Sequence, residues 1–228
     1  MTEVLKHPAA FLFDMDGLLL DTERMFMQAF VTLTSDLGIA THEAEAFFAT
    51  LVGSSKEQTT ARLRDFLPKH VDFNAFDQEW RDLHARNRKS GVPVKKHAQD
   101  LLQAIQVAGI PMAVVTSTFA EPAHHHLEDA GLLAYFQTVC AGDEVCANKP
   151  DPAPYLEAAR RLGVSAQDCV AFEDSDFGTT SAMRAGCFTF QVPDLRPENQ
   201  SFPALGQVIV KDLGEAARQI AALRLTFA

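Results

Sequence analysis

Beyond residue 97, segments with helical periodicity alternate with short apolar runs, and a glycine follows each of four helical segments. These glycines stand where the C-terminus of a helix favours glycine. Strand, helix and glycine repeated in this order predict a doubly wound, mostly parallel α/β sheet. We expect strands at 10–14, 112–116, 138–141, 169–173, 188–192 and 207–210, helices at 97–108, 120–130, 152–162 and 177–185, and helix ends at Gly109, Gly131, Gly163 and Gly186.

Residues 22–90 do not follow this alternation of strands and helices. They are patterned as helix throughout, contain no convincing strand, and include the only tryptophan, Trp80. This pattern predicts an all-α insert at 22–90, placed between the first strand and the remainder of an α/β core domain formed by 1–21 and 91–228.

Composition limits the possible functions. The 228 residues carry a net charge of −10, which argues against nucleic acid as a partner. Any phosphate site must therefore contain a metal or a few cations that make the local electrostatic potential positive. The four cysteines form no C-x-x-C pair, so a zinc or redox motif is not expected. We find neither a signal region before the first strand nor a membrane-spanning apolar run, and we expect a cytoplasmic protein without membrane contact, either a monomer or a weak homo-oligomer.

The first expected strand, FLFDMDG, ends in two carboxylates, Asp14 and Asp16. Residues i and i+2 of a strand point to the same side, so both side chains could converge on one ligand. Gly17 then allows a turn and a close approach of the ligand to the backbone. The alternative is an acidic loop that simply follows a core strand. An EF-hand loop does not fit, because it requires a flanking helix and a glycine at its sixth position.

Three other expected strands also end in polar side chains. Thr116, Ser117 and Thr118 follow one strand, and Lys149 lies between Asn148 and Pro150 after the next. Glu173 and Asp174 end a third. Ligands of open α/β sheets bind beyond the carboxyl ends of the strands, so these residues predict one shared site.

Such a set of residues suits phosphoryl transfer. Clustered carboxylates either take up protons or bind a cation, and Mg²⁺ fits a few hard oxygens together with a substrate phosphate. A carboxylate such as Asp14 can attack phosphorus and form an aspartyl phosphate, while Asp16 is placed to protonate the leaving oxygen and later to activate water. Thr116 and Lys149 would stabilise charge on the phosphoryl oxygens.

The segments FDMDGLLLDTE, VVTST, NKPDP and FEDS resemble, in order and spacing, the four motifs of the haloacid dehalogenase superfamily. The resemblance covers essentially the whole chain, and it implies a Rossmann-like core with a helical cap of the β-phosphoglucomutase-like phosphatase subgroup. By this resemblance Asp14 is the nucleophile and Asp16 the general acid/base, and Thr116 and Lys149 contact phosphate. It also implies Mg²⁺ held by Asp14, the backbone carbonyl of Asp16, Glu173 and Asp174, phosphate contacts from Gly17 and Ser117, and a substrate-binding cap loop at Gly53, Ser54, Ser55 and Lys56.

Within that superfamily, the sequence favours a phosphatase. A halide leaving group needs no proton, so Asp16 argues against dehalogenation. Phe26 occupies the position of a cap histidine of β-phosphoglucomutase, and Lys56 replaces an arginine that could hold a second phosphate with two parallel hydrogen bonds. We therefore expect a Mg²⁺-dependent phosphatase acting on a small phosphorylated metabolite, such as a sugar or sugar-alcohol phosphate. A β-phosphoglucomutase-type phosphomutase and a catalytically silent binding module are the alternatives.

Three further features have no assigned role. The stretch 81–96 is basic and is either a positive approach for an anionic substrate or a solvated helix face. His124, His125 and His126 are consecutive on an expected helix and point in different directions, so we expect surface residues and no shared metal ion. His97 replaces a glycine that related proteins often have at the start of a core helix.

Overall fold

A computed structural model describes residues 7–51, 56–89, 91–196 and 200–222, with the side chains of 56, 57, 221 and 222 left undescribed. The chain forms two compact units. The core unit consists of Met1–Asp21, Pro93–Asp194 and Phe202–Ala228, and the cap unit consists of Thr22–Val92 and Leu195–Ser201. The short segment Leu195–Ser201 was not expected in the second unit. The domain boundaries that we derived from the sequence stay a prediction.

The core unit is built on a parallel sheet of six strands in the order β3-β2-β1-β4-β5-β6. All six lie where the sequence predicted strands, and the predicted fold class, a doubly wound α/β sheet with an inserted helical cap, is confirmed. Strand β1 is central and pairs in parallel with β2 and with β4. The strands are β1 (Ala10–Phe13), β2 (Met112–Val115), β3 (Thr138–Cys140), β4 (Cys169–Glu173), β5 (Phe188–Gln191) and β6 (Val208–Ile209).

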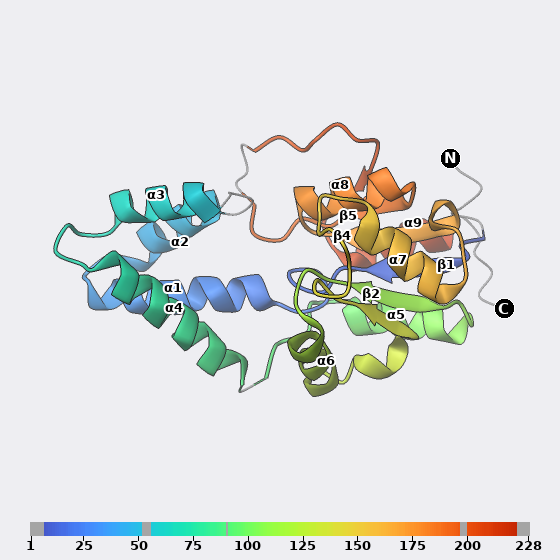
Figure 1. Cartoon of the computed structure of the whole chain (residues 1–228), viewed down its shortest axis with the longest axis horizontal. Helices are drawn as coiled ribbons and strands as arrows, with labels where there is room; N and C mark the ends of the chain where they lie inside the picture. Colours follow the sequence, from blue (N-terminus) through green and yellow to red (C-terminus); the bar gives the residue numbers. More distant parts are fainter. Residues whose placement is uncertain (1–6, 52–55, 90, 197–199, 223–228) are drawn as a thin grey trace. The chain divides into compact units, whose positions relative to one another are not determined.

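Helices lie on both sides of this sheet (Figure 1). Those expected from the sequence are α5 (Ala98–Val107), α6 (Ala120–Asp129), α7 (Ala153–Leu162) and α8 (Asp176–Ala185). The sequence pattern missed α9 (Leu213–Ala222) and the short 3₁₀ helices η2 (Leu133–Tyr135) and η3 (Ala166–Asp168). Gly163 and Gly186 end α7 and α8 in the left-handed conformation, as their positions predicted.

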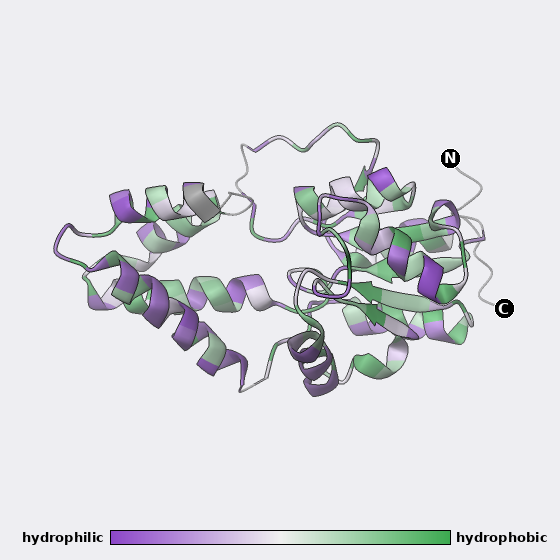
Figure 2. Ribbon diagram, in the orientation of Figure 1, coloured by the Kyte–Doolittle hydropathy of each residue, from purple (hydrophilic) through white to green (hydrophobic). Residues whose placement is uncertain are grey.

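The strands alternate their side chains between two apolar layers. One layer joins Leu12, Val115 and Ala171 to buried residues of α7 and α8. The opposite layer contains stacked rings, with Phe172 lying 4.7 Å from Phe13 and 5.4 Å from Phe190 between ring centroids. Burial on both faces explains why β1 and β2 are apolar throughout, and hydrophobic colours cover much of the sheet in Figure 2.

Among the described residues, the cap unit forms helices α1 (Thr22–Asp36), α2 (Thr41–Leu51), α3 (Lys56–Phe66) and α4 (Phe73–Arg88). Its core is aromatic. Trp80 is 2% exposed, stacks on Phe26 at 4.1 Å between ring centroids, and donates a 2.9 Å hydrogen bond from Nε1 to the Phe26 carbonyl oxygen. Packing of this kind gives the insert a hydrophobic core of its own.

Among the described residues, no helix has both the length and the apolar character that crossing a membrane requires.

Candidate active site

The predicted site residues lie at the carboxyl edge of the sheet, around β1 and β4. These two strands are neighbours. On the side of β1 the chain adds β2 and then β3, and on the side of β4 it adds β5 and then β6. Strand order reverses at this point, and ligands of open α/β sheets bind beyond it. Asp14 follows β1 directly, its N–H donates to the Phe172 carbonyl oxygen (3.0 Å), and Glu173 is the last residue of β4. The topology therefore places the two carboxylates next to each other.

Lys149 joins these strand ends. Its Nζ donates to Asp14 Oδ1, to Glu173 Oε1 (2.6 Å) and to the Val115 carbonyl oxygen at the end of β2 (2.8 Å). The side chain of Lys149 is 7% exposed. The loop that carries it is held by Asn148, which donates from Nδ2 to the Gly142 carbonyl oxygen. The Lys149 ammonium group thus contacts residues at the carboxyl ends of three strands, β1, β2 and β4.

The surroundings of Asp14 and Lys149 alter their ionisation. Burial raises the pKa of Asp14 to about 8; Lys149 opposes this rise, while Glu173 and Asp16 add to it. Burial alone would lower the pKa of Lys149, but the neighbouring Asp14 and Glu173 carboxylates raise it above its usual value. Lys149 therefore stays charged, and burial beside other acids favours the neutral form of Asp14 when no further cation is bound.

Asp16 is oriented by hydroxyls that follow β2. Its Oδ2 accepts a 2.7 Å hydrogen bond from Thr118 Oγ1 and a longer one, 3.3 Å, from Thr116 Oγ1. Thr116 Oγ1 in turn accepts from the Thr118 N–H (3.0 Å). These bonds hold the second carboxylate of the first motif beside the hydroxyl cluster.

Asp14, Glu173 and Asp174 each offer a carboxylate oxygen, and these oxygens lie within 4.8 Å of one another. Hard oxygen ligands in this number suit Mg²⁺, which keeps waters and substrate oxygens in its remaining positions. The raised pKa of Asp14 also fits a site that a divalent cation completes, because such a cation would favour the charged form of this carboxylate. The donor set therefore fits such a cation.

Comparison with known proteins agrees with this geometry. The family described as haloacid dehalogenase-like hydrolase matches residues 11–192. The chain belongs to this family. It is 33% identical over 78% of its length to a protein of Escherichia coli (strain K12) named fructose-1-phosphate phosphatase YqaB, of which the match covers 93%. It is 32% identical over 80% of its length to hexitol phosphatase A of the same organism, of which 82% is covered.

A solved structure shares both units. CbbY from Rhodobacter sphaeroides in complex with phosphate is 26% identical, with a TM-score of 0.64, and the match covers 91% of this chain and 96% of that one. The superfamily that we recognised from four short motifs is thereby confirmed, as is the prediction that the chain is an enzyme of the hydrolase class.

The other residues that we expected in this haloacid dehalogenase-like site stay predictions. Gly17 turns the chain with φ +84°, and its N–H donates to the Leu20 carbonyl oxygen. Ser117 is exposed. The expected cap loop Gly53–Ser55 lies outside the described residues, and Lys56 opens α3 with an undescribed side chain.

The sequence did not point to two residues that the site contains. The Tyr155 hydroxyl of α7 donates a 2.5 Å hydrogen bond to Glu173 Oε1. A Cβ added at Gly178 in α8 would lie 1.9 Å from Glu173 Oε2, so only glycine leaves room for this carboxylate. Tyr155 and Gly178 lie within helices, whereas the sequence indicates site residues only where a polar side chain directly follows an apolar strand. Both act on the side chain of Glu173, which is fully buried.

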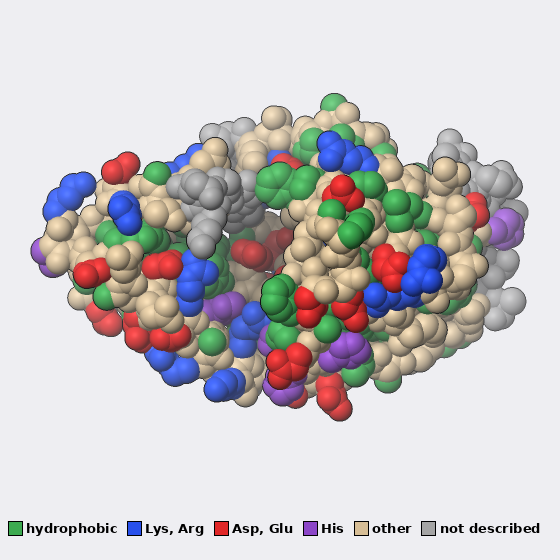
Figure 3. Space-filling view, in the orientation of Figure 1, with side chains coloured by type: hydrophobic (Ala, Val, Ile, Leu, Met, Phe, Trp, Pro, Cys, Tyr) green, Lys and Arg blue, Asp and Glu red, His purple; other side chains and the backbone are tan. Residues whose placement is uncertain are grey.

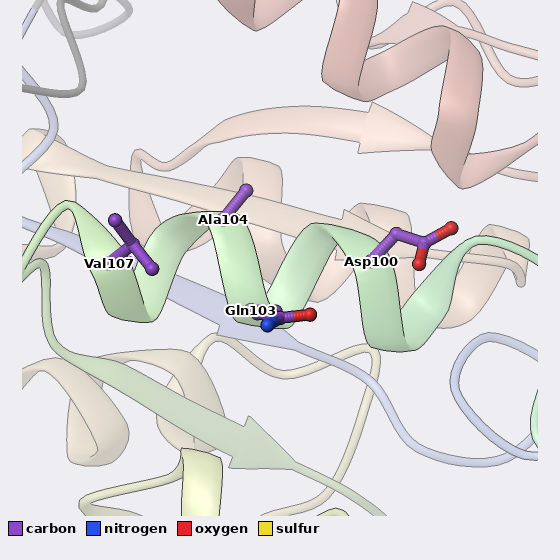
Figure 4. Close-up of a pocket in the computed structure, with 4 residues that line it drawn as sticks. All are labelled: Asp100, Gln103, Ala104 and Val107. Carbon is purple, nitrogen blue, oxygen red and sulfur yellow. The ribbon is translucent and has the colours of Figure 1, made fainter.

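The basic stretch singled out in the sequence contains paired arginines. Arg81 pairs with Asp77 and Arg86 with Glu79, and both arginines are about half exposed, which favours a solvated helix face for this part of the basic stretch. Acidic and basic side chains are interspersed on the face drawn in Figure 3. A pocket on α5, lined by Asp100, Gln103, Ala104 and Val107 (Figure 4), contains none of the strand-end residues.

One expectation about the histidines is wrong. His124 and His125 are exposed, but His126 is buried, at 8% exposure. It shares the inner face of α6 with Ala123 and Leu127, at the i, i+3, i+4 spacing of a helix that faces a core.

Proposed function

We propose that this chain is a Mg²⁺-dependent phosphatase that hydrolyses a small phosphorylated metabolite, a sugar or sugar-alcohol phosphate, through an aspartyl phosphate. The observation that carries the proposal is the meeting of Asp14, Asp16 and Lys149 with the acidic pair Glu173–Asp174 at one edge of the sheet. The names of the two Escherichia coli relatives, a fructose-1-phosphate phosphatase and a hexitol phosphatase, support the substrate class. The phosphate bound by the CbbY structure supports a phosphate site in this fold.

In the proposed reaction, a carboxylate oxygen of Asp14 attacks phosphorus, and the bond between phosphorus and the ester oxygen breaks. Asp16 donates a proton to that leaving oxygen and then removes one from the water that hydrolyses the aspartyl phosphate. Thr118 and Thr116 hold Asp16 for both transfers. Lys149 stabilises the negative charge that spreads over the phosphoryl oxygens.

Asp14, Glu173, Asp174 and the backbone carbonyl of Asp16 would hold the Mg²⁺. The ion would neutralise charge on the phosphoryl oxygens, so that an anionic substrate can lie against an anionic nucleophile.

Neither alternative function gains support. Phe26, at the position of the mutase histidine, stacks on Trp80, packs edge-on against Phe48 and offers no proton. A silent binding module would not need Lys149 and four carboxylates brought together in one site. A cytoplasmic location and a monomeric or weakly associated state stay predictions.

Release of inorganic phosphate from a panel of sugar and sugar-alcohol phosphates, with Mg²⁺ and with a chelator, tests the proposal. We expect turnover only with Mg²⁺, and we expect Asp14→Asn to lower kcat by about 10³-fold or more, because an amide does not replace the nucleophile. Asp36→Asn, an exposed aspartate at the end of α1, serves as the matched control and should leave kcat unchanged. An Asp14→Asn enzyme with intact turnover would exclude the aspartyl phosphate.

A further inference from the structure

The carboxylate of Glu173 accepts hydrogen bonds from three side chains. Oε1 accepts from Tyr155 at 2.5 Å and from Lys149 at 2.6 Å, whereas Oε2 accepts a longer bond, 3.3 Å, from Ser175 Oγ. A short O–H···O⁻ bond is among the stronger hydrogen bonds in proteins. The two oxygens of Glu173 are therefore unequal: Oε1 is held by two short bonds, and Oε2 is the one more available to a cation.

Tyr155 is itself firmly placed. It is 0% exposed and belongs to the apolar layer between the sheet and helices α7 and α8. Helix α7, which carries it, contacts β1, β2 and β3. The Tyr155 ring centroid also lies 5.5 Å from Lys149 Nζ, within the range of a cation–π interaction. The Tyr155 side chain thus contacts both the Lys149 ammonium group and the Glu173 carboxylate.

A buried tyrosine hydroxyl needs a hydrogen-bond partner, and a backbone carbonyl would satisfy that need. Phenylalanine would fill the same apolar space without any such need. Here the partner is instead a carboxylate of the cluster that we expect to hold Mg²⁺. Since the side chain of Glu173 ends in rotatable bonds, a second short bond to Oε1 fixes the plane of its carboxylate.

We propose that Tyr155 is a positioning residue that fixes the Glu173 carboxylate for cation binding and keeps Lys149 shared between Glu173 and Asp14. This inference rests on the proposed function. Without the hydroxyl, Lys149 remains the short-range donor to Oε1 among the described residues, and the carboxylate can rotate. Loss of a residue that orients a metal ligand typically costs 10–100-fold in metal affinity or activity, by general experience with metal sites.

Isothermal titration of the wild type and of Tyr155→Phe with MgCl₂ measures this effect without relying on turnover. We expect Tyr155→Phe to bind Mg²⁺ about 10–100-fold more weakly and to lose kcat by a similar factor. The KM for the sugar phosphate should stay within about threefold, because the hydroxyl contacts the metal ligand and not the substrate. Tyr135→Phe, the same change at the only other tyrosine of the chain, should alter none of these quantities.

A double-mutant cycle with Glu173→Gln locates the effect. If Tyr155 acts through Glu173, then Tyr155→Phe should have little further effect on Mg²⁺ binding in the Glu173→Gln protein. An equal loss in both backgrounds overturns the proposal, and so does unchanged Mg²⁺ binding by Tyr155→Phe. A Tyr155→Phe protein that fails to fold also overturns it, because the hydroxyl would then be a requirement of the core.

The wild type separates this proposal from the proposed function. A wild type that binds Mg²⁺ but hydrolyses no phosphoester contradicts the proposed phosphatase activity. The proposal for Tyr155 is then still tested by comparing Mg²⁺ binding of the wild type and of Tyr155→Phe. A wild type that binds no Mg²⁺ contradicts both.

Discussion

At the scale of single residues, the candidate site depends on how one buried cation is shared among several acids. Lys149 contacts both Asp14 and Glu173, and each of these carboxylates would be costly to bury alone. A bound divalent cation would add to the positive charge that Lys149 supplies to these carboxylates. Residues that hold these groups in place, such as Tyr155 and Gly178, matter as much to the geometry as the charged groups do.

Gly178 gives a direct test of that view. An alanine methyl at this position would meet the Glu173 carboxylate at about 2 Å, so the carboxylate must move away from the cluster. We expect Gly178→Ala to lower kcat about tenfold or more and to weaken Mg²⁺ binding, as loss of orientation at a metal ligand does. Steady-state kinetics over a range of Mg²⁺ concentrations measures both effects.

Gly109→Ala is the contrasting substitution. Gly109 has φ +69°, and an added methyl group would meet no atom within 4 Å. It should cost about 1–2 kcal/mol of unfolding free energy, because an L-residue is strained in this conformation, and it should leave kcat unchanged. Equal kinetics for Gly178→Ala and the wild type would show that Glu173 tolerates displacement.

The polar strand ends could be recognised from the sequence because each lies directly after an apolar run. His97 and His126 show what such a pattern omits. His97 takes a left-handed backbone, φ +68°, a conformation that glycine adopts more readily than a residue with a side chain. His126 is buried because of the direction in which α6 faces, and three adjacent histidines carry no signal for that direction.

At the scale of elements, periodicity and glycine located the strands and most core helices within a few residues. Helix α9 was not predicted, because no glycine and no apolar strand follow it in the sequence to mark its end. The cap helices were expected only as one helical stretch, and their aromatic core depends on contacts between helices that spacing cannot supply. Tyr155 was missed for the same reason: it lies on α7, yet its partner Glu173 ends β4.

Lys95 connects segments of the core unit that are distant in sequence. Its Nζ lies 2.5 Å from Asp194 Oδ1 and 3.3 Å from Asp21 Oδ1, and the side chain of Asp194 is only 5% exposed. Asp21 and Asp194 are the residues at which the chain leaves the core unit. We expect Lys95→Met to lower the free energy of unfolding by about 1–3 kcal/mol, because it leaves a buried carboxylate without its cation.

Urea denaturation of Lys95→Met beside Lys96→Met measures this cost. Lys96 is the exposed neighbour and should be close to neutral when changed. Equal midpoints for the two variants would mean that Lys95 contributes no net stability.

At the scale of the whole molecule, the core and cap units each have a hydrophobic cluster of their own. All the proposed Mg²⁺ ligands lie in the core unit. A ligand that binds only a folded unit stabilises that unit by mass action, by about 2.7 kcal/mol at a concentration 100 times its Kd. Because the chain has two units, one unfolding free energy need not describe it.

We therefore expect differential scanning calorimetry to show two transitions, only one of which moves with Mg²⁺. At saturating Mg²⁺ the transition of the core unit should rise by several degrees over its value in a chelator, since about 1 kcal/mol raises Tm by roughly 2–4 °C in a protein of this size. The transition of the cap unit should stay in place. Asp174→Asn removes one proposed ligand and should reduce the shift, while Asp36→Asn should retain it. A single transition that shifts as a whole would show that the two units unfold as one, and no shift at all would exclude Mg²⁺ binding by these carboxylates.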